Sequence, residues 1–211
     1  MTSLKAKLAG LCGLLLAPAL VMAAGHDKRF RQLTVEELTP QQHVVTDEVL
    51  KVSSLGLQGP YNVMLRSPAM AAKLLDLLRL LRFHTTVPHH LNEFAILIQA
   101  RLWTSSVEWL AHHPIALKAG LPGTVLDELR DGRRPTAMSR DVAAVYDFSI
   151  ELSTTHAVSE PTYAVLRDHL DNRQIVDLTT AIGAYVTTAM LLAVGEEPTS
   201  DGPAPLPPLD R

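Results

Sequence analysis

The chain has 211 residues, of which 47% are hydrophobic and only 5% aromatic, so its apolar bulk comes mainly from Leu, Ala, Val and Ile. This length suits a single domain with a sizeable core, and the aliphatic composition is expected where helices pack on helices. The formal net charge of −3 provides no basic excess, which argues against nucleic acid as a partner.

The first 23 residues have the features of a secretory signal peptide. Lys5 and Lys7 supply a positively charged start, and residues 8–22 form an apolar run. The pattern Val21-Met22-Ala23, with small residues at its first and last positions, predicts cleavage after Ala23. The run is shorter than the roughly 20 residues that span a bilayer, which disfavours an uncleaved anchor. We therefore expect an exported protein, periplasmic or secreted, with no membrane association after cleavage.

Cleavage would change both the redox chemistry and the charge of the chain. Cys12 is the only cysteine and would leave with the signal peptide, so the mature chain could form no intramolecular disulfide or dithiol site. Loss of Lys5 and Lys7 would also take the net charge from −3 to −5. A general attraction to anionic membranes is then not expected.

The mature chain divides into an arm, a helical domain and a tail. Residues 24–58 are polar and have few periodic apolar positions, so we interpret them as an ordered arm or a short helix. Residues 59–198 form the predicted helical domain. The Pro-rich residues 199–211 are expected to be disordered.

Helical periodicity and turn signals predict an all-α domain without strands. The expected helices cover residues 69–83, 91–103, 106–119, 122–130, 139–155, 160–169 and 172–194. The last helix is apolar nearly all round, which favours a central position or a subunit interface.

Three polar residues near the middle of the chain fall on one helix face. Ser105, Glu108 and His112 lie three and seven positions apart, within about 60° of one another at 3.6 residues per turn. Glu108 and His112 are an i,i+4 pair that can hydrogen-bond, and such a pair suits acid/base chemistry. Glu93, from the preceding helix, could approach the same place. Two carboxylates beside an imidazole in an apolar pocket would have their pKa values pushed apart.

The same residues also allow structural interpretations. Ser105-x-x-Glu108 fits a capping box at a helix start, and His112 could then be a histidine satisfied by Glu108. Glu93, Glu108 and His112 could also supply metal ligands, but no H-E-x-x-H pattern is present and we expect no metal site.

The segment LNEFAILIQARLWTSSVEWLAHHPIALKAGL at 91–121 resembles the carboxymuconolactone decarboxylase and alkylhydroperoxidase D-like family. Redox members of that family carry E-x11-C-x2-C-x3-H, and the same spacing here has Glu93, Ser105, Glu108 and His112. Further likeness lies in GPYNVMLRSPAMA, HPIALKAGLP and LTTAIGAYVTTAMLLAVGEEP. The likeness covers about residues 59–198 and is closest to the decarboxylase-like branch without cysteines.

The resemblance implies an alkylhydroperoxidase D-like helical bundle that assembles into homotrimers or hexamers. The redox members reduce peroxides through a thiolate and a resolving thiol, which Ser105 cannot replace. The decarboxylase members release CO2 from a small lactone acid without a cofactor. The implied roles are His112 as proton donor or acceptor, Glu108 as its orienting partner, and Glu93 as a second acid or base.

Several further residues are candidates for binding the substrate. They are Ser105, Trp109, Tyr61, Asn62 and Arg66, and the guanidinium groups of Arg66 and Arg82 suit bidentate binding of a carboxylate. A surface or structural role is the alternative for the arginines.

Three functions remain open from the sequence. The leading hypothesis is a cofactor-free lyase or isomerase acting on a small carboxylated, lactone-type compound. The second is a peroxidase of the alkylhydroperoxidase D-like type, which the missing cysteines disfavour. The third is a small-molecule-binding protein without catalytic activity.

Overall fold

The computed structural model describes residues 28–51, 53, 56–199 and 206–209. Within these ranges the chain is all-helical and contains no strand, as predicted. The predicted signal peptide and Cys12 lie outside the described residues. The elements are η1 (Val35–Glu37), α1 (Pro40–Leu50), α2 (Pro60–Met64), α3 (Pro68–Phe83), α4 (His89–Leu102), α5 (Ser106–Lys118), α6 (Gly123–Arg130), α7 (Arg140–Thr155), α8 (Glu160–Arg167) and α9 (Asn172–Gly195).

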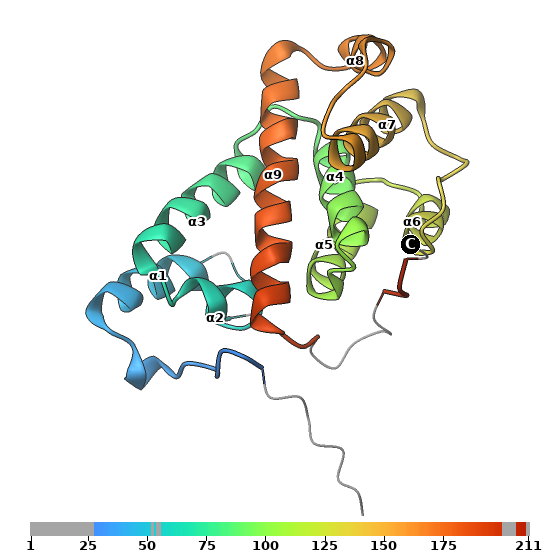
Figure 1. Cartoon of the computed structure of the whole chain (residues 1–211). Coiled ribbons are helices and arrows are strands. Elements are labelled where there is room, and N and C mark those ends of the chain that lie inside the picture. The colour runs from blue at the N-terminus through green and yellow to red at the C-terminus, as the bar shows by residue number, and fades with distance from the viewer. Residues whose placement is uncertain (1–27, 52, 54–55, 200–205, 210–211) are drawn as a thin grey trace, which may run out of the picture.

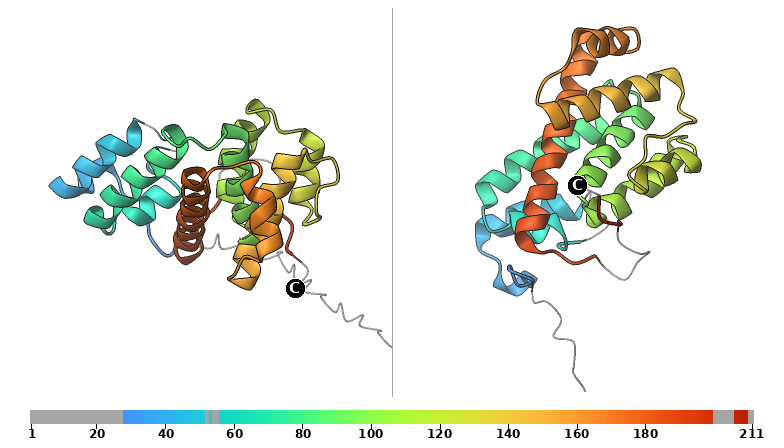
Figure 2. Two further views of the ribbon diagram at one scale, coloured as in Figure 1. Left: turned by 90° about the horizontal axis from the view of Figure 1, so that it is seen from above. Right: turned by 45° about the vertical axis from the view of Figure 1, so that its right-hand side comes forward.

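The long helix α9 stands between two groups of helices. Figure 1 shows α1, α2 and α3 on one side of it and α4 to α7 on the other, and the view from above in Figure 2 agrees. Asp171 caps the start of α9 by accepting a hydrogen bond from the backbone N–H of Gln174, whose side chain bonds back to the Asp171 N–H. This reciprocal cap explains why the helix begins where the sequence predicts.

Helix α4 is the most deeply buried element. Every residue from 91 to 101 is buried, because α5, α7 and α9 all pack against this helix. Phe94, Leu97 and Ile98 lie in the main hydrophobic cluster and have no exposed surface. A side chain on α4 is therefore held in place from several directions, which suits a residue that must be positioned accurately.

A sharp turn separates α4 from α5. Thr104 adopts a left-handed backbone conformation with φ of 51°, which is rare for a β-branched residue. Ser105 then donates its backbone N–H to the carbonyl oxygen of Ala100 at 2.7 Å. The turn lets α5 run back along α4, so residues on these two helices face each other across a close interface.

The N-terminal arm packs onto the helical domain. Its helix α1 contributes Val45 and Val49 to a second hydrophobic cluster, together with Met64 and Leu75 from α2 and α3. The backbone N–H of Arg29 donates to the carbonyl oxygen of Gly195 at the end of α9. The predicted short helix in this arm is present, and it helps to form a core.

The described part of the C-terminal tail is ordered against α5. Leu206 is buried in the main cluster, and its backbone N–H donates to Oγ of Ser106 at 3.0 Å. Arg101 lies near the same segment, with Nη2 3.5 Å from the carbonyl oxygen of Pro208. The sequence predicts a disordered tail over 199–211, whereas the structure places residues 206–209 against the helical domain, with Leu206 in a buried position.

Helix α9 is the one element among the described residues with the length and hydropathy to cross a membrane. Half of its most apolar 18-residue window is buried within the molecule, and core helices commonly meet the same criterion. Its outward face carries the exposed side chains of Val176, Met190 and Val194.

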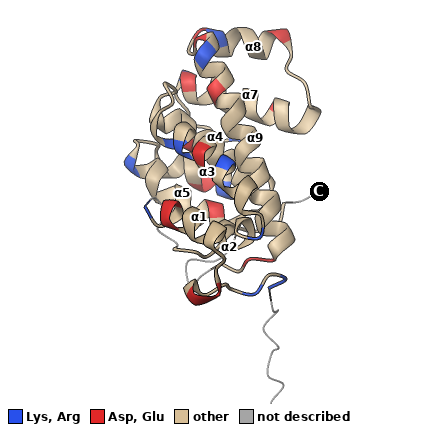
Figure 3. Cartoon of the chain, turned by 90° about the vertical axis from the view of Figure 1, so that its left-hand side faces the viewer, with Lys and Arg blue, Asp and Glu red and all other residues tan. Residues whose placement is uncertain are grey.

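In the side view of Figure 3, acidic and basic segments are interspersed over the helices.

Candidate functional site

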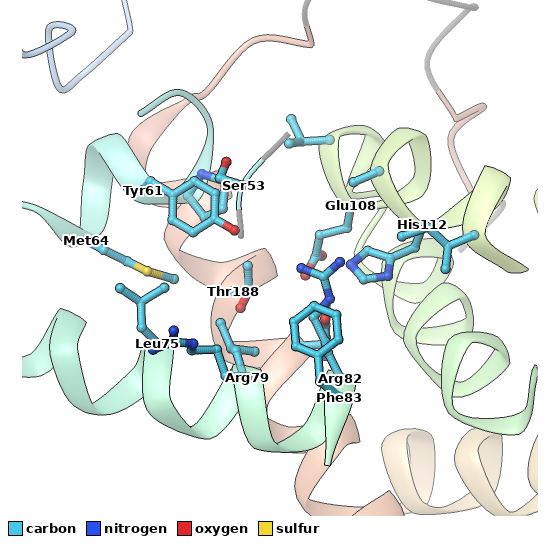
Figure 4. Close-up of a pocket in the computed structure, with 16 residues that line it drawn as sticks. Ser53, Tyr61, Met64, Leu75, Arg79, Arg82, Phe83, Glu108, His112 and Thr188 are labelled. Carbon is cyan, nitrogen blue, oxygen red and sulfur yellow. The ribbon is translucent and has the colours of Figure 1, made fainter. Parts of the chain in front are cut away.

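A pocket lies where the two groups of helices meet, with α9 along one wall (Figure 4). Its volume of ≈ 80 Å³ is several times the roughly 10–15 Å³ that one water requires, so a compact organic molecule could enter. The wall is mixed, with aliphatic and aromatic side chains surrounding a few ionisable groups. The ionisable residues of the wall are Tyr61, Arg79, Arg82, Glu108, His112 and Tyr185.

His112 is paired with Glu93 across the interface between α5 and α4. Nδ1 of His112 lies 2.7 Å from Oε2 of Glu93, whose side chain is only 1% exposed. A carboxylate accepts hydrogen bonds, so this contact favours the tautomer of His112 that carries its hydrogen on Nδ1 and leaves Nε2 for exchange with a ligand. The edge of the His112 ring meets the ring of Tyr185 at 4.9 Å between centroids, which fixes its orientation.

This pairing corrects the predicted role of Glu108. The i,i+4 spacing suggested that Glu108 orients His112, but the described hydrogen bond comes from Glu93 instead. The close packing of α4 against α5 brings Glu93 within reach, which spacing along one helix could not reveal. Glu93 is therefore the orienting partner, and Glu108 is free for another role.

Glu108 is a buried carboxyl group in the pocket wall. Its side-chain oxygens make no hydrogen bond with any residue that the structure describes. Burial raises the pKa of Glu108 to about 8, and the nearby Ser105 hydroxyl lowers it only in part. Glu108 is therefore mainly protonated at neutral pH and can act as an acid.

The alternative capping box at Ser105 is not formed. Ser105 occupies the N-cap position of α5, but its side chain accepts no capping hydrogen bond. Its hydroxyl oxygen is buried and does not line the pocket. Trp109 is also absent from the pocket wall, because it packs in the main cluster and stacks on His113. Neither Ser105 nor Trp109 therefore lines the pocket in which they were predicted to contact a ligand.

Asn62 and Arg66 fasten the N-terminal arm and do not line the pocket. The Asn62 side chain is buried and donates to the carbonyl oxygen of Phe30 and to Oε1 of Glu197. Arg66 donates to the backbone carbonyl oxygens of Arg31 and Asn62. The structure does not bring them to this pocket, because their polar groups are used to hold the arm. Their role in substrate binding stays a prediction.

Two arginines on α3 line the pocket, and they differ in their partners. Arg79, which sequence reasoning missed, forms an ion pair with Glu48 at 2.8 Å. Arg82 forms no hydrogen bond or ion pair with any described residue, although it packs over the Phe83 ring. In Figure 4 its guanidinium group projects toward Glu108 and His112. Arg79 and Arg82 are three residues apart on α3, and this spacing could have indicated that both lie on one face of the helix.

Two tyrosines complete the polar part of the wall. Tyr61, at the start of α2, lines the pocket as predicted. Tyr185 on α9 was not foreseen. Burial raises the pKa of Tyr185 well above its usual value, and the charge of Arg82 opposes this only partly. Its hydroxyl group therefore stays protonated at neutral pH and can donate a hydrogen bond.

Within the described part of the chain, no group of three or more His, Cys, Asp or Glu side chains is arranged to hold a metal ion. A comparison with models of known protein families and with curated protein sequences finds no match to this chain.

Proposed function

We propose that this protein is a cofactor-free acid/base enzyme, a lyase or isomerase of the carboxymuconolactone decarboxylase-like type, acting on a small carboxylated compound. The proposal rests on one observation above all. Arg82, which forms no ion pair with any described residue, shares a pocket with an oriented histidine, His112. An unpaired cation in a half-buried wall favours an anionic ligand.

The roles follow from the environment of each group. Arg82 binds the substrate carboxylate, and Nε2 of His112 takes up or delivers the proton. Glu93 fixes the tautomer of His112 from the opposite side. Glu108, which is protonated at neutral pH, supplies a second proton or a hydrogen bond to a carbonyl oxygen. These steps need no redox group, and a thiol-dependent peroxidase is disfavoured because Cys12 is the only cysteine.

A binding protein without turnover is the second candidate. The observation in its favour is that both side-chain oxygens of Glu108 are buried, so a bound ligand would have to open the wall to reach them. Ligand affinity without any chemical change in the ligand would identify this case.

The first experiment measures whether Arg82 recognises a carboxylate. Purified protein is titrated calorimetrically with γ-butyrolactone carboxylic acids and 2-keto acids, each paired with its methyl ester, and CO2 release is followed by mass spectrometry. Arg82→Gln is expected to weaken binding of the acids about ten- to a hundredfold, because a charge-assisted hydrogen bond is lost. The esters should bind weakly to both proteins.

Arg79→Gln is the matched control, since Arg79 lines the same pocket but is already paired with Glu48. It should bind the acids nearly as well as the parent protein. Equal loss in both variants would show a general effect of positive charge, and equal binding of acid and ester would contradict carboxylate recognition.

We also propose that the protein is exported and works as a homotrimer or hexamer. The exposed apolar side chains on α9, Val176, Met190 and Val194, support an interface between copies. Light scattering coupled to size exclusion should give a multiple of the chain mass, and Met190→Glu should shift it toward the monomer. A monomeric parent protein would exclude the assembly without affecting the proposed chemistry.

A further inference from the structure

Glu93 contacts a second imidazole besides His112. Oε1 of Glu93 lies 3.5 Å from Nε2 of His89, which is the first residue of α4 and stands one helical turn earlier. The three side chains differ sharply in exposure: 7% for His112, 1% for Glu93 and 57% for His89. They form a row from the pocket to the surface.

A second, open pocket lies on the outer side of this row. His89, Glu93 and Thr85 help to line it, and it shares Arg82, Phe83 and Ile115 with the inner pocket. Glu93 therefore separates the inner pocket, where His112 would meet a ligand, from the outer pocket, where His89 meets solvent.

The two imidazoles at the ends of this row have opposite surroundings. His112 is almost fully buried and shares the wall of the inner pocket with Arg82, whereas His89 is exposed to solvent. The two oxygens of the Glu93 carboxyl group each face one of these rings. The row therefore connects a buried imidazole with a solvent-exposed one through a single carboxyl group.

We propose that His89 is the outer end of a proton relay that runs from His112 through Glu93 to solvent. When Nε2 of His112 accepts a proton, Nδ1 passes its own proton to Oε2 of Glu93, and the ring stays neutral. A half-turn of the carboxyl group, which is a two-fold torsion, presents that proton to Nε2 of His89. His89 then releases one proton to water, and Glu93 returns to the carboxylate.

The reverse sequence reloads the site. When Nε2 of His112 gives its proton to the product, Nδ1 regains a proton that enters through His89 and Glu93. One proton leaves and one enters over an isomerisation, and a decarboxylation takes up one net proton by the same route. The use of the relay in turnover rests on the proposed function, whereas proton exchange with solvent does not require a substrate.

The test measures that exchange in the ligand-free, full-length protein. Proton NMR of ¹⁵N-histidine-labelled protein reports the exchange rate of the His112 Nδ1 proton with water. His89→Ala and His89→Gln are both expected to slow it by about tenfold or more, because each lacks a group that carries protons. Added free imidazole should restore the rate in His89→Ala.

The control is His169→Ala, an exposed histidine next to α8, which should leave the rate unchanged. Unchanged exchange in both His89 variants would overturn the relay and assign the exchange to the inner pocket. Slowing in His89→Ala alone, with a normal rate in His89→Gln, would also overturn it and show a packing role. Slowed exchange in a protein that turns over no compound would retain the relay and reject only the enzymatic proposal.

Discussion

His112→Ala is expected to lower turnover of the carboxylated substrate by about 10²–10⁴-fold, the usual contribution of a positioned general acid or base. The ring lines the pocket and is held by Glu93 at 2.7 Å, so its removal takes away the oriented acid/base group. The rate is measured as CO2 release or ring opening, and the fold is checked by circular dichroism.

Removal of the ring also takes a hydrogen bond from the buried Glu93, so a stability loss of about 1–3 kcal/mol is expected alongside the kinetic effect. His112→Asn separates the two, because its side-chain amide can still donate to Glu93 but cannot carry a proton. His112→Asn should have a higher free energy of unfolding than His112→Ala and should remain inactive. His113→Ala, on the same helix but outside the pocket wall, should keep its activity. Activity retained in His112→Asn would contradict the acid/base role.

Glu108→Gln is expected to remove a marked loss of stability between about pH 4.5 and pH 8. The pKa of Glu108 is raised to about 8 in the folded chain and is near its ordinary value when unfolded. Below pH 4.5 Glu108 is protonated in both the folded and the unfolded chain, so there is no charge whose burial would cost stability. As the pH rises, the unfolded chain ionises first, so the folded state loses stability until about pH 8. The total is on the order of a few kcal/mol.

Urea unfolding at a series of pH values measures this effect. The parent protein and Glu108→Gln should have similar free energies of unfolding near pH 4.5, and the variant should be the more stable at pH 8. Glu128→Gln gives a control of opposite sign, since hydrogen bonds from Thr136 lower the pKa of Glu128. The loss of folding stability between pH 4.5 and pH 8 should persist in Glu128→Gln. Parallel pH profiles for the parent protein and Glu108→Gln would mean that Glu108 is ionised in the fold.

The sequence predicts the helices well because their ends carry local signals. Proline at the start of α3 and the reciprocal cap at Asp171 act within one turn of chain, so the sequence alone contains them. The break after α4 was also predictable from the Thr-Ser-Ser run. The alkylhydroperoxidase D-like arrangement and the assembly remain predictions, because they depend on packing between elements and between copies.

The site was only partly predictable for the same reason. His112, Glu108 and Tyr61 do line one pocket, but the choice of Glu93 as the partner of His112 depends on how closely α4 and α5 approach. The position of Asn62 outside this pocket was not predictable, because its partners come from the arm and from Glu197, far away in sequence. The sequence suggested Arg82 as a residue that could bind a carboxylate. It did not show which arginine forms no ion pair with the described residues.

The two sides of the pocket differ in how freely they could evolve. Glu93 belongs to the stretch 91–101 of α4, in which every position is buried, so most substitutions within this stretch would disturb the core. Arg79, Arg82 and Phe83 lie on α3 at partly or fully exposed positions, where replacement carries a small folding cost. Descendants of this chain could therefore acquire new ligands by changing α3 alone, while inheriting the His112–Glu93 pair unaltered.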